Sequence, residues 1–338
     1  MNSVTVIIPA YNAEVCLARC LESVFAQRRP PEQVIVVNDG STDNTKKVAD
    51  GYANRIEYFE QANQGPGASR NEGLKAARCE YVAFLDADDC WLPGFLSGCV
   101  GFLDRHPEAV AVSTGQMHKL WGHGDVIRPQ LLQSPDCPKD PFTIDNFYSF
   151  WAEHNHVVTG ACLIRRSVIE KAGFQRTDFR VCEDLEYWGY LATFGKWGFI
   201  PEVLWVGDPM PAAAAQGWLK RYAPRWQNLP TLEQWESRIL PRLRPDDVEG
   251  FQRVKSRVAA ILVHHNILGG NDGEAKHILV ELGDAAPRTH IMRLLRAGLK
   301  GGTAGWFLAC TMVRLRERLK SRAIAVSSRW SSKNSSTL

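Results

Sequence analysis

Short apolar runs rich in β-branched residues alternate with helix-like patterns through the first 110 residues of the chain. Val4–Ile8, Val34–Val37 and Tyr81–Leu85 are typical of buried strands, and turn residues follow each of them. Ala13–Gln27 and Ala68–Ala77 lie between these runs and show helical spacing of apolar residues. Because alternating strands and helices indicate a mainly parallel sheet, we predict an α/β fold with a central sheet flanked by helices.

The pattern changes after this region. Residues 111–210 are less regular, with a strand expected at Gly160–Ile164 and helices at Ser167–Ala172 and Glu183–Phe194. Pro209–Ala215 reads as a connector. We therefore predict a first domain over 1–210, a helical extension over 211–287, a basic helical segment over 288–326 and a disordered tail over 327–338, where six of twelve residues are Ser.

Charge is distributed unevenly along the chain. The formal net charge of +3 combines 11 Lys and Arg with one acid from Arg288 onward, and 29 bases with 36 acids in the 287 residues before it. Between Thr289 and Arg322, apolar residues recur at helical spacing and Arg314 and Arg318 lie on a neighbouring face. A basic amphipathic helix suits an anionic membrane surface. The alternatives are a helix packed on the acidic body, and nucleic acid, which we do not expect as a partner.

Nine cysteines are scattered without a C-x-x-C pair, which indicates neither a disulfide framework nor a zinc site. The first strand begins at Val4 without a basic leader, and no apolar stretch reaches the length of a spanning helix. We expect a cytoplasmic protein that is peripheral at the inner face of the membrane if the basic helix binds lipid.

Three predicted strands end in polar clusters. These are Tyr11-Asn12, Asn38-Asp39-Gly40-Ser41 and Asp86-Ala87-Asp88-Asp89. In open α/β sheets, ligands bind beyond the carboxyl ends of the strands, so the three clusters are expected to share one crevice. The D-x-D carboxylates suit Mg²⁺ or Mn²⁺ with substrate phosphates, although D-x-D is also an ordinary turn. Asp39 suits the edge of a nucleobase, or else belongs to a capping turn.

Two further segments carry charge at predicted helix starts. Gly65-Pro66-Gly67 leads to Arg70, where backbone N–H groups and a guanidinium suit a diphosphate. Glu183-Asp184 opens another helix, as cap residues or with one carboxylate as a general base. Eight of the eleven Trp fall between Trp121 and Trp235, and Trp188 and Trp226 are candidates for stacking on sugars.

Taken in order, these segments resemble the GT-A glycosyltransferases of family 2, an inverting family that uses nucleotide-diphosphate sugars. The similarity rests on five segments: Val4-Thr-Val-Ile-Ile-Pro-Ala-Tyr-Asn12, Val36-Val-Asn-Asp-Gly-Ser-Thr-Asp43, Asn63-Gln-Gly-Pro-Gly-Ala-Ser-Arg-Asn71, Phe84-Leu-Asp-Ala-Asp-Asp89, and Gly160-Ala-Cys-Leu-Ile-Arg-Arg166 leading to Glu183-Asp184. It covers about the first 205 residues. The resemblance implies that the first domain is a GT-A catalytic domain.

The resemblance also implies roles for single residues. They are Pro9 and Tyr11 beside the base, usually uracil, Asp39 bonded to the base, Arg70 near the diphosphate, Asp86 at the ribose, Asp88 on a Mg²⁺ or Mn²⁺ ion, and Asp184 as catalytic base. Apart from the resemblance, Glu183, Trp188 and Trp226 are possible acceptor or donor contacts. Gly207-Asp208-Pro209 follows the strand at Pro201–Val206, where many relatives place a histidine.

The predicted function is therefore transfer of a hexosyl group, with inversion, from a nucleotide-diphosphate sugar. A UDP-sugar is the favoured donor, and the acceptor is a hydroxyl of a glycan or lipid-linked molecule in cell-surface polysaccharide or glycolipid assembly. Tyr222-Ala-Pro-Arg225-Trp226 stands in place of the Q-x-x-R-W of processive synthases, which favours a non-processive enzyme. The alternatives are a sugar nucleotidyltransferase and a catalytically silent module that binds nucleotide sugars.

Overall fold

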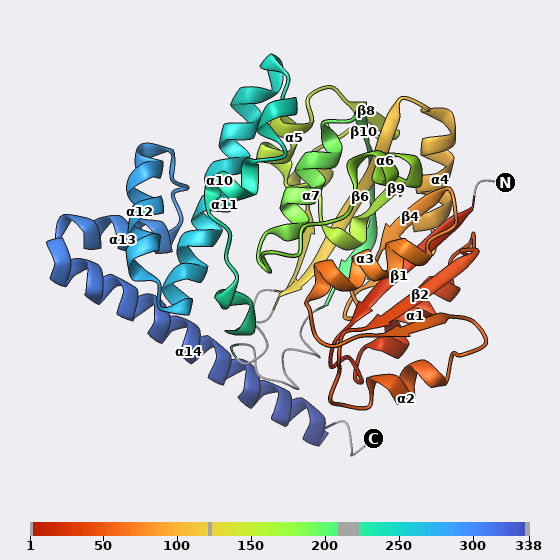
Figure 1. Cartoon of the computed structure of the whole chain (residues 1–338), viewed down its shortest axis with the longest axis horizontal. Helices are drawn as coiled ribbons and strands as arrows, with labels where there is room; N and C mark the ends of the chain where they lie inside the picture. The colour runs from red at the N-terminus through yellow and green to blue at the C-terminus, as the bar shows by residue number, and fades with distance from the viewer. Residues whose placement is uncertain (1–2, 121–123, 209–218, 220–222, 335–338) are drawn as a thin grey trace. The chain divides into compact units, whose positions relative to one another are not determined.

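The computed structural model of the chain describes residues 3–120, 124–208, 219 and 223–334, with side chains as far as Arg322 except at Leu120 (Figure 1). Its strands are β1 Val4–Ala10, β2 Gln33–Asn38, β3 Glu57–Glu60, β4 Tyr81–Phe84, β5 Cys90–Trp91, β6 Ala109–Leu120, β7 Gly124–Arg128, β8 Phe142–Ile144, β9 Cys162–Arg165 and β10 Lys196–Gly207. Its α-helices are α1 Leu17–Phe25, α2 Thr45–Asp50, α3 Pro66–Ala76, α4 Phe95–Arg105, α5 Phe147–His154, α6 Arg166–Ala172, α7 Glu183–Ala192, α10 Leu232–Glu236, α11 Val248–Gly269, α12 Asp272–Leu282, α13 His290–Lys300 and α14 Gly302–Asn334.

All the described strands belong to one sheet in the order β3-β2-β1-β4-β9-β6-β10-β5, with β7 paired to β6 and β8 to β10. The parallel arrangement predicted for the first strands is confirmed, because β1 pairs in parallel with both β2 and β4, and β2 with β3. The far half of the sheet is mixed. There β9 runs antiparallel to both β4 and β6, while β6 and β10 are parallel.

The two faces of the sheet are covered by different helices. Alternate residues of β1 such as Val6 and Ile8 join the core formed with α1 and α4. On the other face, a Cβ at Gly73 of α3 would come within 2.4 Å of Ile7, so α3 approaches β1 more closely than any side chain at 73 would allow. Trp188 of α7 packs against Phe84 of β4, with ring centroids 6.2 Å apart. The sheet is therefore the middle layer of an α/β/α sandwich.

The chain divides into two compact units. The first comprises Met1–Thr177, Glu183–Ala212 and Arg238–Gly250, and the second comprises Asp178–Cys182, Ala213–Ser237 and Phe251–Leu338. The boundary predicted at 210/211 lies outside the described residues. Arg238–Gly250 was expected in the helical extension and instead belongs to the first unit.

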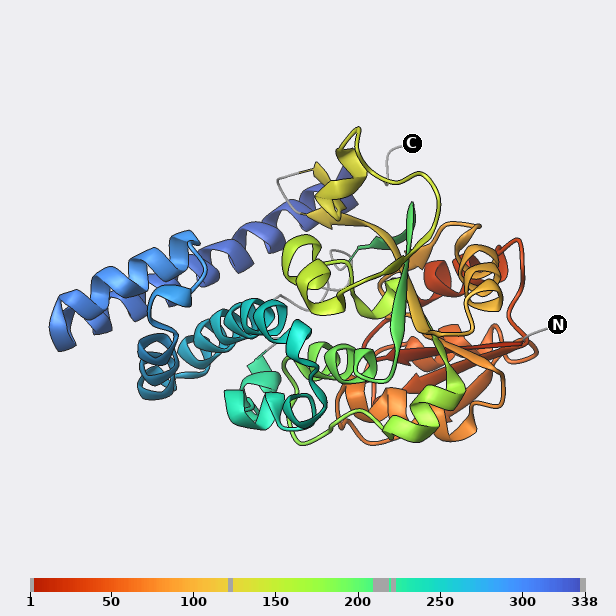
Figure 2. The same cartoon turned by 90° about the horizontal axis from the view of Figure 1, so that it is seen from above.

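The second unit is helical. Helix α13 lies along the first part of α14, where a Cβ at Gly298 would come within 2.6 Å of Ala309 (Figure 2). The basic segment thus forms two helices, and the tail predicted as disordered is helical as far as Asn334, because extending an existing helix is much easier than starting one. Residues 335–338 lie outside the described part. Within the described part, none of the helices combines the length and apolarity needed to cross a bilayer.

Candidate functional site

The loops that follow β1 and β2 are bonded to each other. The backbone N–H groups of Asn12 and Ala13 donate to the hydroxyls of Ser41 and Thr45, at 2.9 and 2.7 Å. In return, Oδ1 of Asn12 accepts from the N–H of Thr42 at 2.7 Å. Asn12 adopts a φ of +47°, a left-handed conformation that Asn tolerates better than most residues. These bonds bring the first two predicted polar clusters together.

Asp39 directly follows β2 and is buried. Its carboxylate accepts hydrogen bonds from the side-chain amide of Gln61 at 2.7 Å and from the N–H groups of Gln64 and Gly65 at 2.9 and 2.8 Å. Gly65 has a φ of +93° and directly precedes α3. Since a carboxylate can accept about four hydrogen bonds, Asp39 fixes the turn into α3 and retains acceptor capacity for one more donor.

Arg70 of α3 is a buried cation among carboxylates. Its guanidinium donates to Oδ1 of Asp86 at 2.8 Å and lies 3.9 Å from Oε1 of Glu183. Burial alone lowers the pKa of Arg70, but the charges of Asp86, Glu183 and Asp184 outweigh burial and raise it. The structure thus unites three segments that the sequence analysis selected separately: the glycine-led helix, the D-x-D loop and the start of α7.

The D-x-D loop is fixed by residues that sequence reasoning did not place in the site. The guanidinium of Arg19 donates to the backbone oxygen of Asp88 at 2.5 Å and also pairs with the carboxylate of Asp208, which lies 3.4 Å from Nζ of Lys119. The N–H of Asp208 donates to Oδ1 of Asp89 at 3.2 Å. Burial, and then the charges of Asp88 and Asp86, raise the pKa of Asp89. Asp208, noted above for replacing a histidine, therefore anchors this loop.

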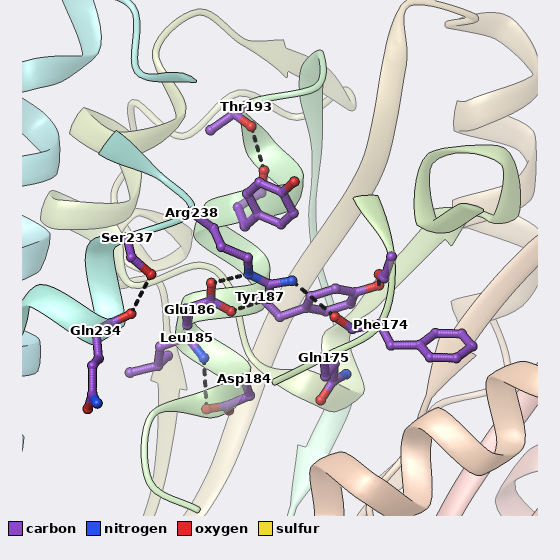
Figure 3. A network of polar contacts seen from close by, with 12 residues as sticks. Phe174, Gln175, Asp184, Leu185, Glu186, Tyr187, Thr193, Gln234, Ser237 and Arg238 are labelled. Carbon is purple, nitrogen blue, oxygen red and sulfur yellow. Dashed lines mark hydrogen bonds and ion pairs between the residues drawn. The ribbon is translucent and has the colours of Figure 1, made fainter. Parts of the chain in front are cut away.

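Asp184 lies at the start of α7 (Figure 3). Its Oδ1 accepts from the N–H of Leu185 at 2.8 Å, and its Oδ2 accepts from the Thr159 hydroxyl at 3.4 Å. Cys182, directly before the helix, has a φ of +61°, which is uncommon for a residue with a side chain and indicates a constrained entry into α7. Glu183 is buried, and its carboxylate lies beside the Arg70 guanidinium.

A second ion pair holds α7 from another side. Arg238 donates through Nε and Nη2 to the two carboxylate oxygens of Glu186, at 2.7 and 2.5 Å, and through Nη1 to the carbonyl of Phe174 at 3.1 Å (Figure 3). The Glu186 side chain is fully buried and that of Arg238 is 25% exposed. Sequence reasoning missed Arg238 because it was assigned to the helical extension, 52 residues from its partner.

The remaining predicted residues lie in different surroundings. Pro9 is buried within β1, and Tyr11, just beyond the strand, is 39% exposed. Trp188 is fully buried against Phe84 and Tyr187, so its predicted role as a sugar contact is wrong: the amphipathic start of α7 turns this ring into the core. Trp226 belongs to the second unit, where its indole N–H donates to Nδ1 of His265 at 2.8 Å.

The carboxylates of the D-x-D loop are suited to a hard divalent cation. Within the described part of the chain, no group of three or more His, Cys, Asp and Glu is arranged to hold a metal ion. Mg²⁺ is commonly held by one or two carboxylates together with waters and substrate phosphates, so this donor set still fits it. Of these carboxylates, Asp86 is paired with Arg70.

Solved structures with this fold confirm the GT-A architecture. The chain superposes on TarS 1–349 of S. aureus in complex with UDP with a TM-score of 0.57 and 20% identity, covering 94% of this chain and 92% of that one. The mannosyltransferase PcManGT from Pyrobaculum calidifontis, in complex with GDP-Man and Mn²⁺, gives a TM-score of 0.54 and 20% identity over 93% of this chain and 87% of that one.

Sequence relatives agree with this fold. The putative glycosyltransferase EpsH of Bacillus subtilis is 43% identical over 93 residues, 27% of each chain. An uncharacterized glycosyltransferase of Nostoc sp. is 44% identical over 179 residues, 50% of this chain and 52% of that protein. Among such curated relatives the match spans between 13% and 52% of their length. Residues 5–173 match the family model described as glycosyl transferase family 2. The chain therefore belongs to glycosyl transferase family 2.

Proposed function

We propose that this glycosyltransferase is a non-processive, inverting enzyme of the hexosyltransferase type. It moves a sugar from a nucleotide-diphosphate sugar, with a UDP-sugar as the favoured donor, to a hydroxyl of a glycan or lipid-linked acceptor in cell-surface polysaccharide or glycolipid assembly. The observation that carries this proposal is the cluster in which the buried Arg70 joins Asp86 of the D-x-D loop, which is 37% exposed, to the buried Glu183 at the start of α7.

In this proposal Asp184 is the catalytic base. It stands beside Glu183 at the helix start, and its carboxylate is oriented by the Leu185 N–H and the Thr159 hydroxyl. A base must be held within reach of the proton that it removes, and these bonds fix the carboxylate while leaving it acceptor capacity. It removes the proton of the acceptor hydroxyl as that oxygen attacks the anomeric carbon. One displacement from the face opposite the leaving nucleoside diphosphate inverts the configuration.

The donor is held by the polar ends of the strands. Asp39 offers its remaining acceptor capacity to an N–H of the nucleobase, with Pro9 and Tyr11 beside the ring, and Asp86 reaches the ribose. Arg70 is near the diphosphate but already neutralises carboxylates, so its main contribution is to hold Asp86 and Glu183 in place. The complexes of TarS with UDP and UDP-GlcNAc support a UDP-sugar as donor.

A divalent cation completes the donor site. Asp88 would hold Mg²⁺ or Mn²⁺, and such an ion, when bound, neutralises the charge of the departing diphosphate. The Mn²⁺ complex of PcManGT supports this assignment. Arg19 maintains the geometry of the loop by binding the backbone oxygen of Asp88.

The test uses a panel of nucleotide sugars with a mixture of glycan and lipid-linked acceptors. Release of nucleoside diphosphate from one donor, together with a glycosylated product of inverted configuration, is the expected result. Asp184→Asn should abolish product formation and leave the affinity for UDP nearly unchanged, because the amide keeps the shape but accepts no proton. Product formation by Asp184→Asn at a similar rate would remove Asp184 from the role of base.

Two controls separate the other functions. Glu183→Gln keeps the local shape and should retain more activity than Asp184→Asn, because Glu183 pairs with Arg70 in this proposal. Asp88→Ala should weaken UDP binding in Mn²⁺ and have little effect with chelator. UDP-sugar binding without turnover under any condition would favour the silent module. Formation of UTP and sugar 1-phosphate from the UDP-sugar when pyrophosphate is added would favour the nucleotidyltransferase.

The cellular place of the reaction follows from the acceptor. A lipid-linked acceptor requires the enzyme at a membrane surface, and we propose the cytoplasmic face, where nucleotide sugars are available. The C-terminal helix α14, which exposes large apolar side chains such as Leu315, supports this part of the proposal.

A further inference from the structure

Helix α14 carries apolar side chains on two opposite faces. One face is buried within the second unit and is formed by Trp306, Ala309, Cys310 and Val313. It is held there by the Trp306 indole, which donates to the backbone oxygen of Asp272 at 3.2 Å, and by Arg314, which donates to the backbone oxygen of Ile267 at 2.9 Å. This face therefore packs α14 against the rest of the second unit.

The other face remains exposed. Leu308, Met312, Leu315 and Leu319 follow one another at steps of four, three and four residues, which places them in one line along a helix. Their exposed fractions are 60, 48, 54 and 56%, and Phe307 beside them is 66% exposed. We call these five residues the apolar stripe. A contiguous group of large exposed apolar side chains marks an interaction surface, whereas a single one needs no explanation.

Cations border the apolar stripe on both sides. Arg316 and Lys320 lie toward one side of it, and Arg318 and Arg322 toward the other, and all four are exposed. The one acid between Trp306 and Arg322 is Glu317, whose side chain is 4% exposed. Its Oε1 lies 3.8 Å from Nε2 of His264 and 3.7 Å from Nη1 of Arg316. The border of the apolar stripe therefore carries four cations, of which Arg316 is paired with a buried carboxylate, and the net charge of this face is positive.

We propose that the apolar stripe and its bordering cations bind an anionic lipid surface, with α14 lying in the plane of the interface. The Leu and Met side chains enter the boundary between headgroups and acyl chains, while the guanidinium and ammonium groups stay at the level of the lipid phosphates. Charge complementarity selects this occupant, because each basic group near an anionic membrane surface adds to binding.

A second copy of the chain fits the same stripe less well. The four-three-four spacing resembles the seam of a coiled coil, but the positions beside the seam would then be Arg316 and Arg318. An antiparallel pair in register places these arginines beside one another. In a parallel pair the next seam position after Leu319 is Arg322 of both copies. Like charges at these positions disfavour self-association, whereas lipid phosphates neutralise them.

This inference does not rest on the proposed reaction, because lipid binding is measured on the full chain without donor or acceptor. The assay is co-sedimentation with vesicles of phosphatidylcholine alone and with vesicles that contain roughly one-third phosphatidylserine, at low and high salt. We expect binding to the anionic vesicles, at least tenfold weaker binding to neutral ones, and loss of most binding at high salt.

Three variants test the surface. Leu315→Asn with Leu319→Asn removes apolar area, and Arg318→Gln with Arg322→Gln removes charge, so each double variant should bind anionic vesicles at least tenfold more weakly. Val280→Asn is the matched control, because Val280 of α12 is 61% exposed and lies outside the apolar stripe, and it should bind like the wild type.

Two results would overturn the proposal. One is vesicle binding that is unchanged in both double variants. The other is a dimer in light scattering, without vesicles, that Leu315→Asn with Leu319→Asn converts to a monomer, since the stripe would then be a self-interface. Circular dichroism checks that the variants retain their helices, and UDP binding, measured separately, reports on the donor site alone.

Discussion

The two units depart from the usual distribution of side chains in opposite senses. In the first unit, charged groups that normally stay in water are buried, as Arg70 and Glu183 are. In the second, large apolar groups that normally pack in a core are exposed, as Leu308 and Leu315 are. Buried charges and exposed apolar patches are the informative exceptions in a folded protein. The contrast teaches that one unit is built for chemistry on a polar ligand and the other for contact with a surface.

Removing the buried cation is the most damaging change that we expect. Arg70→Met removes the buried cation beside Glu183 and Asp86, and breaking a buried ion pair costs about 3–5 kcal/mol of unfolding free energy. Urea denaturation measures the loss. Arg78→Met is the matched control, because Arg78 pairs with Glu57 on the surface, and it should unfold like the wild type. Equal urea midpoints for the two variants would show that burial of Arg70 adds nothing to the free energy of unfolding.

The second-largest effect is expected for the ion pair between Arg238 and Glu186, which holds α7. Arg238→Ala leaves a fully buried Glu186 carboxylate unpaired and should destabilise the chain by about 3 kcal/mol. Because Arg238 acts on Asp184 only through α7, it is a positioning residue: kcat should fall while the affinity for donor stays the same. Glu186→Gln leaves only the Arg238 cation, which is 25% exposed and reaches water, and should be milder in both respects. If Glu186→Gln is as damaging as Arg238→Ala, the charge on Glu186 is not what matters.

The two faces of α14 provide an internal comparison. Val313 is buried, so Val313→Ala should lower the unfolding free energy by about 2 kcal/mol through lost packing and a small cavity. Leu315 is two residues away and exposed, and Leu315→Ala should change it by no more than about 0.5 kcal/mol. Thermal or urea unfolding in the absence of lipid checks both. A large loss for Leu315→Ala would mean that the apolar stripe is already covered.

Mild acid should lower the stability of both units slightly. Burial, and then the charge of Arg128, lower the pKa of His118 in the first unit to about 4, and burial with His264 and Arg225 does the same for His265 in the second. The unfolded chain takes up these protons near pH 6.5, so stability is lost as the pH falls from about 6.5 toward 4. His118→Gln and His265→Gln should each reduce the fall in urea midpoint between pH 7 and 6. An unchanged fall in both variants would contradict these pKa values.

The sequence was most informative where structure is local. The β-branched runs of β1, β2 and β4 and the polar residues after them were found because strand period and turn chemistry lie within a few residues. Strand β10 was recognised only over Pro201–Val206, since Pro201 interrupts its pattern and register shifts follow Ile200 and Val203. Long strand β6 was missed because polar residues such as Gln116 and His118 continue it beyond its apolar start.

Within the site, the difference between the residues found and those missed is one of sequence distance. Asp86, Glu183 and Asp184 stand in motifs whose order could be recognised. Arg19 and Asp208 are 189 residues apart, and a lone arginine in an amphipathic helix has no local feature that marks its partner. Such pairs are set by the tertiary fold, so a single sequence does not reveal them.

The bonds of Asp39 to the turn before α3 have a thermodynamic consequence. The carboxylate proposed to read the nucleobase holds the N–H groups of Gln64 and Gly65, and Arg70 follows one helical turn later on the same rigid element. Base recognition and the ion-pair cluster therefore both depend on α3. The changes in unfolding free energy caused by mutating Asp39 and Arg70 should not be additive. Such coupling is reciprocal. If binding of the base stabilises the ordered α3, an ordered α3 strengthens binding of the base by the same free energy.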